Sequence, residues 1–263
     1  MTETILVEHR AGWRKVTLNR PEKLNALNRA TLHALIDVLK QAEADESCRA
    51  LLLTGTGRGF CAGAELGQAG AGGDGPRDLG ASIEQAWNPL ARTLHNLRMP
   101  TVCAVNGIAA GAGASLALGC DIVVAARSAK FLQAFARIGL VPDCGGTWLL
   151  PNLAGQARAR GMAMLAEPIP AETALAWGMI WAVADDDAFM AEAEALATKL
   201  AAMPTQALLL TRTALAAAAH TSFDAQLDIE RDSQRAAGLT PDHAEGVRAF
   251  LEKRPAVFTG RAG

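Results

Sequence analysis

Three motifs that mark common enzyme chemistries are missing from this sequence of 263 residues. It has no G-x-S-x-G elbow, no H-E-x-x-H pair, and no phosphate-binding loop with Lys and Ser or Thr in register. Those motifs position a nucleophilic serine, a zinc ion, and the phosphates of a nucleotide. Their absence argues against serine-nucleophile, zinc and ATP chemistries.

An excess of charge of one sign is missing as well. The 25 Lys and Arg residues nearly balance 27 Asp and Glu residues, for a net charge of -2. This balance provides no basic surface for nucleic acid or an anionic membrane, so small molecules or proteins are the favoured partners. Residues 1–15 carry charges throughout and lack the apolar core of a signal peptide, which predicts a cytoplasmic protein.

Long apolar runs and paired cysteines are also scarce. Met99 to Cys120 has no charged residue, but four glycines and many alanines keep its apolarity low, and its pattern divides into strand and helix. We therefore expect no membrane span. The five cysteines are an odd number without a C-x-x-C pair or nearby His ligand spacing, which indicates reduced, buried thiols and no metal site.

The periodicity predicts an α/β protein. Two short strands are expected at Ile5 to Val7 and Trp13 to Leu18, followed by a helix that Asn28 caps. Strands and helices then alternate, which favours a mainly parallel sheet. Further strands are expected at Ala50 to Thr54, Thr101 to Val105, Ile122 to Ala125 and Lys130 to Leu132, with a long helix over Ile83 to Leu97 and one short return to the sheet at Met179 to Val183. The chain from Cys144 onward is mostly helical, and its last two helices pack either on a neighbouring subunit or on their own domain.

Two segments rich in small residues each follow an apolar strand: Phe60 to Leu66 and Gly107 to Leu116. Each could present a free backbone N–H to one carbonyl oxygen, and enolate chemistry needs such a pair of donors. Close packing of helix on strand is the alternative explanation for the small residues. The segment Gly55 to Phe60 resembles the start of a dinucleotide fingerprint, but Phe60 stands at its sixth position in place of glycine, so dinucleotide binding is not favoured.

Enolate chemistry also needs a proton acceptor, and Asp143 is the candidate. It lies among apolar residues and glycines immediately before a predicted helix. An apolar pocket would raise the pKa of its carboxyl group toward values useful for a general base. The local pattern equally fits an N-cap aspartate, the commoner role. Glu65 similarly fits a residue that caps or braces a helix.

Four ordered motifs together resemble the enoyl-CoA hydratase/isomerase (crotonase) superfamily over Ile5 to about Gly260. The motifs are Asn19 to Ala26, Gly57 to Leu66, Asn106 to Gly113 and Pro142 to Thr147. The resemblance implies a crotonase-like spiral of ββα units in residues 1–200 and a C-terminal helical trimerisation region in residues 201–263. It also implies a homotrimer, or a hexamer formed by two trimers.

The resemblance further implies an acyl-CoA substrate and the residues that hold it. The thioester oxygen would lie between the backbone N–H groups of Ala64 and Ala112. Coenzyme A enters as part of the substrate, and no separate cofactor is expected. Its site would be lined by Leu24, Ala26, Arg58 and Ala62, and completed by Phe250 and Lys253 from a neighbouring subunit.

Departures from the family pattern suggest the reaction. Hydratases of the family use two glutamates, and the matching positions here hold Ser115 and Phe135. Asp143, which matches the base position of isomerases, remains as a single carboxylate, so the resemblance favours isomerisation of acyl-CoA thioesters. Phe131, Phe135 and the Gly67 to Gly80 loop would shape an apolar acyl pocket. A hydratase or thioesterase of the same fold, and a non-catalytic acyl-CoA-binding relative, stay open as alternatives.

Overall fold

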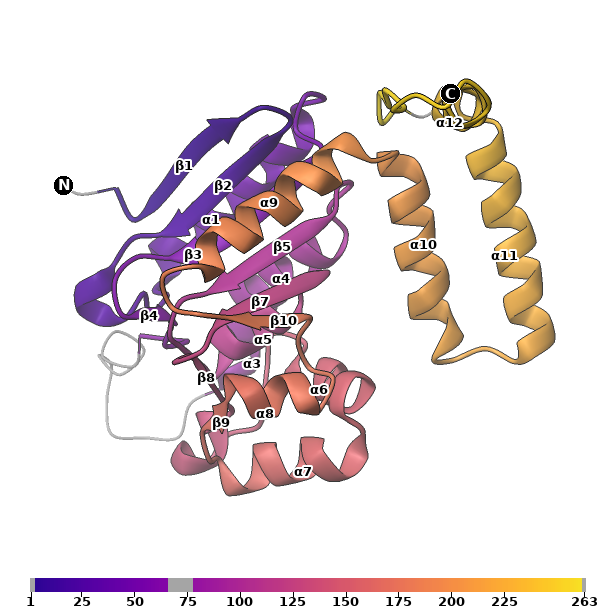
Figure 1. Ribbon diagram of the computed structural model, residues 1–263. Coiled ribbons are helices and arrows are strands. Elements are labelled where there is room, and N and C mark those ends of the chain that lie inside the picture. Colours follow the sequence, from indigo (N-terminus) through magenta and orange to yellow (C-terminus); the bar gives the residue numbers. More distant parts are fainter. Residues whose placement is uncertain (1–2, 66–77, 262–263) are drawn as a thin grey trace.

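The computed structural model describes residues 3–65 and 78–261, which form two sheets wrapped by helices (Figure 1). The larger sheet has the strand order β1-β2-β3-β5-β7-β10, and the smaller one has the order β4-β6-β8-β9. Only β1 against β2 and β8 against β9 are antiparallel. The strands are β1 (Ile5–Arg10), β2 (Trp13–Leu18), β3 (Ala50–Gly55), β4 (Gly59–Cys61), β5 (Thr101–Val105), β6 (Ile108–Ala110), β7 (Ile122–Ala126), β8 (Lys130–Leu132), β9 (Ile169–Pro170) and β10 (Ala182–Ala184).

From β3 to β8, consecutive strands alternate between the two sheets. In the pairs β3 and β4, β5 and β6, and β7 and β8, the first strand extends the large sheet and the second extends the small one. Helical turns follow each pair, so the described chain is a repeat of ββα units that builds a spiral. This arrangement confirms the predicted fold class. It also adds a strand that was not predicted, because Ile108–Ala110 form β6 between β5 and α5.

Helices cover both faces of the large sheet. Helix α9 lies across one face, where Ala193, Ala197 and Leu200 pack on strand residues such as Leu52 and Val102 (Figure 1). Helices α1, α4 and α5 bury the opposite face in the main core. The described helices and helical turns are η1 (Pro21–Lys23), α1 (Arg29–Ala44), α3 (Gly80–Ser82), η2 (Ile83–Trp87), α4 (Asn88–His95), α5 (Ala112–Leu118), η3 (Ala134–Ile138), α6 (Gly146–Ala154), α7 (Gln156–Leu165), α8 (Ala171–Ala176), α9 (Phe189–Ala202), α10 (Thr205–Ala218), α11 (Phe223–Gly238) and α12 (Pro241–Leu251).

Local sequence signals explain several boundaries. The Asn28 side chain accepts a hydrogen bond of 2.9 Å from the Thr31 N–H and caps α1, as predicted. The long helix expected before Pro100 runs from Gly80 to His95 and contains one π-helical turn at Ile83–Trp87. The predicted return to the large sheet is confirmed but begins later, at β10, which pairs in parallel with β7. Among the described residues no helix has both the length and the apolarity to cross a membrane.

Helices α10 to α12 stand away from the sheets (Figure 1). Two arginines connect this region to the body. Arg49 donates a hydrogen bond of 2.6 Å to the carbonyl of Phe258, and Arg212 of α10 forms an ion pair of 3.2 Å with Asp121. Apolar side chains on these helices remain exposed, including Leu215, Phe223, Leu239, Phe250 and Leu251.

The packing of α5 on β4 generates a stability prediction. A Cβ atom on Gly113 would lie 2.3 Å from the Cys61 carbonyl oxygen, so we expect Gly113→Ala to destabilise the fold by about 1–3 kcal/mol. Gly161→Ala is the matched control, because Gly161 lies inside α7 with open space around it; we expect a gain of about 0.5–1 kcal/mol there. Urea unfolding measures the change in folding stability of each variant. Equal midpoints for the two variants would contradict the packing described for α5.

Candidate active site

Ala64 presents a backbone N–H that the described chain leaves free. Leu27 pairs with the residues on either side of it: the Leu27 N–H donates to the Gly63 carbonyl at 2.7 Å, and the Glu65 N–H donates to the Leu27 carbonyl at 3.0 Å. In a parallel pairing of this kind, the N–H of the central residue points away from its partner strand. Within residues 3–65 and 78–261 the Ala64 N–H donates to no protein acceptor.

The Ala112 N–H lies beside this turn. Ala112 is the first residue of α5, and its amide has no acceptor inside the helix or elsewhere in the described chain. A Cβ atom on Gly63 would lie 2.8 Å from the Ala110 carbonyl oxygen and 3.4 Å from the Ala112 nitrogen. Gly63 also has a φ of +87°, which favours glycine. The two small-residue segments therefore touch, and only glycine fits at their contact.

Ala64, Ala112 and Asp143 line one cavity of about 630 Å³, which we call the central cavity. Most of its other side chains are apolar: Ile83 and Trp87 come from the helical segment before α4, and Phe135 and Val141 come from the chain around η3. Such a cavity is large enough for the acyl end of a small thioester and excludes much of the water around it.

Asp143 is half-buried at this cavity, and one of its carboxylate oxygens has no compensating partner. Its Oδ1 atom is inaccessible to solvent and accepts no hydrogen bond from the described residues. Desolvation raises the pKa of the carboxyl group to about 6, against a small opposing effect of its own backbone N–H. The N-cap position of α6 is Gly145, and no side chain caps that helix. The N-cap interpretation of Asp143 is therefore wrong.

Glu65 is held by polar contacts, and the helix that it was expected to cap or brace is not among the described residues. It forms an ion pair of 2.8 Å with Arg20 and accepts a weaker hydrogen bond from Asn28 at 3.3 Å. The Arg20 guanidinium lowers the pKa of Glu65, which keeps its carboxylate ionised. Among the described residues that line the central cavity, Asp143 is the only carboxylate.

The acyl-pocket prediction is partly corrected. Phe135 lines the central cavity, but Phe131 is fully buried in the core and does not reach it. Side chains alternate between the two faces of a strand, and the register of β8 turns Phe131 inward. Residues 67–77 of the predicted Gly67 to Gly80 loop lie outside the described residues. Leu79 lines the cavity at the end of that segment.

The residues expected around coenzyme A separate into two groups. The Ala62 N–H donates to the Leu24 carbonyl at 2.9 Å, and Ala62 lines the edge of the central cavity. Ala26 is buried nearby, and Arg58 is exposed on the turn between β3 and β4. Phe250 lies near the end of α12 and Lys253 just after it; neither lines the central cavity, and α12 stands away from the sheets in Figure 1.

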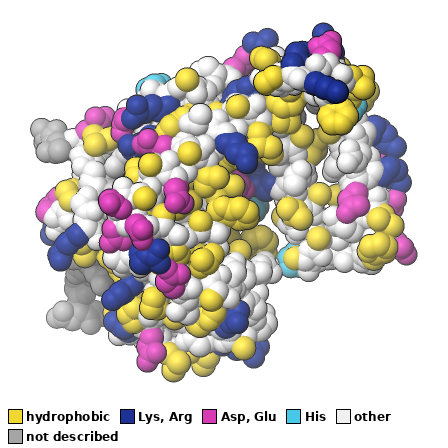
Figure 2. Space-filling view, in the orientation of Figure 1, with side chains coloured by type: hydrophobic (Ala, Val, Ile, Leu, Met, Phe, Trp, Pro, Cys, Tyr) yellow, Lys and Arg dark blue, Asp and Glu magenta, His cyan; other side chains and the backbone are white. Residues whose placement is uncertain are grey.

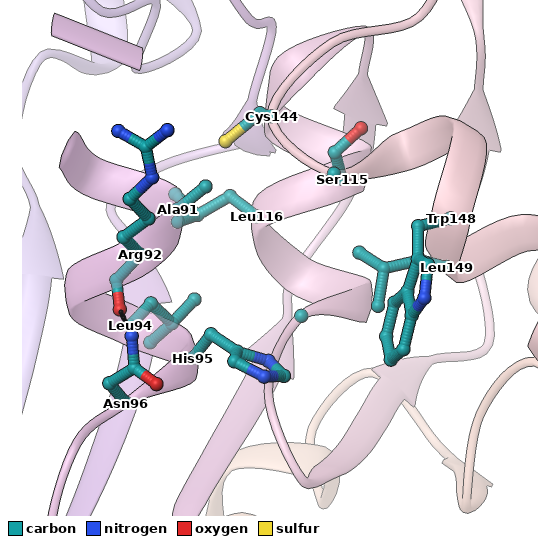
Figure 3. Close-up of a pocket in the computed structure, with 12 residues that line it drawn as sticks. Ala91, Arg92, Leu94, His95, Asn96, Ser115, Leu116, Cys144, Trp148 and Leu149 are labelled. Atoms are coloured by element: carbon teal, nitrogen blue, oxygen red, sulfur yellow. Dashed lines mark hydrogen bonds between the residues drawn. The ribbon is translucent and has the colours of Figure 1, made fainter. Parts of the chain in front are cut away.

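Two features of the site were missed in the sequence. Arg137 lines the central cavity and donates to the Ala166 carbonyl; its place five residues after the predicted strand at Lys130 to Leu132 was an available signal. A second cavity of about 400 Å³ lies behind the turn formed by Asp143 to Gly146, which we call the Asp143 turn. It lies between α4, α5 and α6 (Figure 3). It shares Cys144 and Gly145 with the central cavity, and Trp148 packs edge-on against His95 at its side. No local pattern marks it, because its walls come from three separate segments.

The spiral of ββα units and the two free amides beside an apolar cavity match what the crotonase resemblance implies. The chain matches the enoyl-CoA hydratase/isomerase family over residues 8–261 and belongs to that family. It is 53% identical to the 1,2-epoxyphenylacetyl-CoA isomerase of Escherichia coli, over 99% of this chain and 100% of that protein. It is 36% identical to the 2,3-dehydroadipyl-CoA hydratase of the same organism, over 94% of each chain.

Solved structures agree with this assignment. The enoyl-CoA hydratase/isomerase of Cupriavidus metallidurans superposes with a TM-score of 0.91 at 31% identity, covering 99% of this chain and 97% of that one. The enoyl-CoA hydratase of Bacillus anthracis superposes with a TM-score of 0.90 at 29% identity, covering 98% and 100% of the two chains. The family resemblance inferred from the motifs is confirmed.

The desolvation of Asp143 predicts a pH-dependent difference in folding stability between the wild type and Asp143→Asn. The carboxyl group ionises near 3.8 when the chain is unfolded and near 6 when it is folded. As pH rises between these values, the unfolded state loses the proton first, so folding becomes less favourable, by about 3 kcal/mol once both are passed. Asp143→Asn removes this penalty. We expect it to be more stable than the wild type at pH 8 by about that amount.

Urea unfolding of the two proteins at a series of pH values measures this difference. The gap should close as pH falls from about 6 to 4, because the wild-type carboxyl group becomes protonated in both states. A gap that stays constant over this range, or widens toward acid, would show that Asp143 is not desolvated.

Proposed function

We propose that the protein is an intramolecular isomerase of coenzyme A thioesters. In this proposal it converts ring-1,2-epoxyphenylacetyl-CoA to the seven-membered oxepin-CoA and shifts 3-enoyl-CoA double bonds to the 2-position. The observation that carries the proposal is the single desolvated carboxylate, Asp143, in a cavity with two free amides. The name of the relative that is 53% identical, 1,2-epoxyphenylacetyl-CoA isomerase, supports the ring substrate and a role in phenylacetate breakdown.

The chemistry follows from the geometry. Asp143 removes a proton from the carbon next to the thioester carbonyl, and the electron pair moves onto the carbonyl oxygen as an enolate. The Ala64 and Ala112 N–H groups donate to that oxygen, and one preorganised donor of this kind is worth about 3 kcal/mol. The protonated Asp143 then returns the proton two carbons further along, which moves the double bond. A base with a pKa near 6 is well matched to this cycle at neutral pH.

The absence of a second carboxylate separates this reaction from hydration. Water addition by the two-glutamate route needs a second acid or base, but the positions that would supply it hold Ser115 and Phe135. Asp143 is the only carboxylate in the described lining of the central cavity. One carboxylate is sufficient for proton removal and return.

The decisive experiment is proton NMR of a 3-enoyl-CoA incubated in D2O with the wild type and with Asp143→Asn. We expect double-bond migration with deuterium uptake for the wild type, and a rate about 10²–10⁴-fold lower for the variant, because a positioned general base contributes that factor. Calorimetry should show that the variant still binds the thioester. Glu167→Gln, an exposed carboxylate outside the cavity, is the control and should leave turnover intact.

Other outcomes would overturn the isomerase assignment. Water addition across a 2-enoyl-CoA would indicate a hydratase, and release of free coenzyme A would indicate a thioesterase. Binding without any chemical change across a panel of thioesters would indicate a non-catalytic acyl-CoA-binding protein. Turnover by Asp143→Asn at the wild-type rate would exclude Asp143 as the base.

We also propose that the coenzyme A site is shared between subunits. Leu24, Ala26, Arg58 and Ala62 would hold the coenzyme A moiety of the substrate, with no separate cofactor. Phe250 and Lys253 would complete the site from a neighbouring subunit. The 83% exposure of Phe250 supports this arrangement, because an apolar side chain so exposed on a single chain is suited to a contact between subunits. A cytoplasmic location remains our prediction.

Residues 201–263 are then the trimerisation region, and the protein forms a homotrimer or a hexamer of two trimers. Figure 2 shows apolar side chains grouped over α12 and at the turn between α10 and α11, as such a contact requires. We expect light scattering after size exclusion to give the mass of three or six chains. Phe250→Asp should weaken both assembly and thioester binding. A stable monomer with full thioester affinity would contradict the shared site.

A further inference from the structure

The Asp143 turn has an unusual backbone that its own sequence does not stabilise. Cys144 and Gly145 have φ angles of +51° and +84°, and the Gly146 N–H closes the turn by donating to the Asp143 carbonyl at 2.9 Å. A non-glycine residue such as Cys144 in the left-handed region costs about 1 kcal/mol or more and persists only where its surroundings hold it. The groups packed against this turn therefore fix the place of Asp143.

Ser115 of α5 is the group in closest contact with the turn. A Cβ atom on Gly146 would lie 2.6 Å from the Ser115 Oγ atom, so the hydroxyl occupies the space that a side chain at 146 would fill. Ser115 is 1% exposed, and its hydroxyl has only one weak acceptor, the Gly111 carbonyl at 3.5 Å. In Figure 3 the hydroxyl is directed away from the second cavity. Its contact with Gly146 is the main feature of its environment.

Gln133 approaches the same point from the end of β8. Its Nε2 atom would lie 3.6 Å from a Cβ atom on Gly146. The side chain is fully buried, and neither of its polar atoms has a hydrogen-bond partner in the described chain. An apolar residue of the same size would be more stable there, since a buried unpaired polar group costs about 1–3 kcal/mol. Two polar side chains, together with the Pro142 Cβ atom at 3.3 Å, therefore lie around the space that a Cβ atom on Gly146 would fill.

Helix α5 connects this contact to the other half of the site. It begins at Ala112, whose N–H faces the central cavity, and Ser115 follows three residues later, one helical turn along. The same short helix therefore carries an enolate donor at its start and the surface against which the Asp143 turn rests. A displacement of the Asp143 turn against Ser115 changes the separation between the Ala112 N–H and the Asp143 carboxylate.

We infer that Ser115 is a positioning residue, whose hydroxyl supports Gly146 and so fixes the Asp143 carboxylate relative to the Ala112 amide. This inference rests on the proposed function, because it assigns Ser115 a role in proton transfer by Asp143. Where hydratases of the family are expected to carry a glutamate, this chain carries a side chain small enough to contact the turn without displacing it.

The inference is tested by enlarging the side chain at Gly146 and then removing the hydroxyl group of Ser115 that it would meet. In Gly146→Ala the new methyl group meets the Ser115 Oγ atom, so the turn must shift. We expect kcat to fall at least tenfold with KM within about threefold, since a misplacement of 1 Å can cost about 10²-fold in rate. In the double variant Ser115→Ala/Gly146→Ala the oxygen is gone, and kcat should return to within about threefold of the wild type. Gly161→Ala is the control variant for a glycine that packs against nothing.

The pH dependence of kcat/KM distinguishes a positioning role of Ser115 from a general loss of stability. A displaced Asp143 becomes more hydrated, so the acid limb of kcat/KM should move to lower pH in Gly146→Ala and return in the double variant. The other titratable groups that line the central cavity within the described residues are Arg137 and Cys144. Burial raises the pKa of the Cys144 thiol to about 12, so it stays neutral over this range.

Wild-type turnover in Gly146→Ala, or a double variant as impaired as Gly146→Ala, would overturn the inference. Should Gly146→Ala not fold, the single variant Ser115→Ala tests the inference. A kcat loss of a few fold, with the acid limb of kcat/KM moved by about half a pH unit, supports positioning, and an unmoved acid limb overturns it.

If the wild type proves inactive, the proposed function fails. NMR titration of Asp143 in the same variants then tests the contact separately: a midpoint that falls in Gly146→Ala and returns in the double variant supports it, and an unchanged midpoint overturns it.

Discussion

The close approach of two backbone turns is the constraint on which the rest of this structure depends. Gly63 lies so near Ala110 and Ala112 that any side chain at 63 would collide with the main chain. A Cβ atom on Gly113 would likewise meet the Cys61 carbonyl oxygen. Both contacts allow two segments separated by some fifty residues to turn one N–H each toward the same cavity. The spiral of ββα units brings these segments together, because each unit places its second strand in the small sheet.

The site is built at some expense to stability. Asp143 and Gln133 bury polar atoms without partners, and Cys144 adopts a left-handed conformation. Each of these features is unfavourable by about 1–3 kcal/mol. The core that surrounds them is extensive, with strand and helix residues on both faces of the large sheet buried. That core keeps the carboxylate in an apolar environment, which raises its pKa and makes it a useful base.

The sequence predicts the larger elements well and the site less completely. The N-cap at Asn28, the strands of the large sheet and the C-terminal helices follow from periodicity and capping, which are local properties. Strands β4, β6 and β9 have only three, three and two residues, and the first two lie in segments rich in glycine and alanine, which carry no strand pattern. For Asp143, the local pattern favoured an N-cap, because only the assembled fold reveals its burial and the left-handed turn that moves the cap to Gly145. Phe131 and Phe135 look equivalent in the sequence, but Phe131 lies in β8 and faces the core, whereas Phe135 lies in η3 and lines the cavity.

The central claim is that burial in the cavity makes Asp143 a base near neutral pH. The most direct test is a carbon NMR titration of its carboxyl group in the wild-type protein, assigned by comparison with Asp143→Asn. The account predicts a midpoint near 6, about two pH units above the ordinary value of 3.8. A midpoint at or below 3.8 would contradict it, because the carboxylate would then be well solvated or paired and poorly suited to take a proton from carbon.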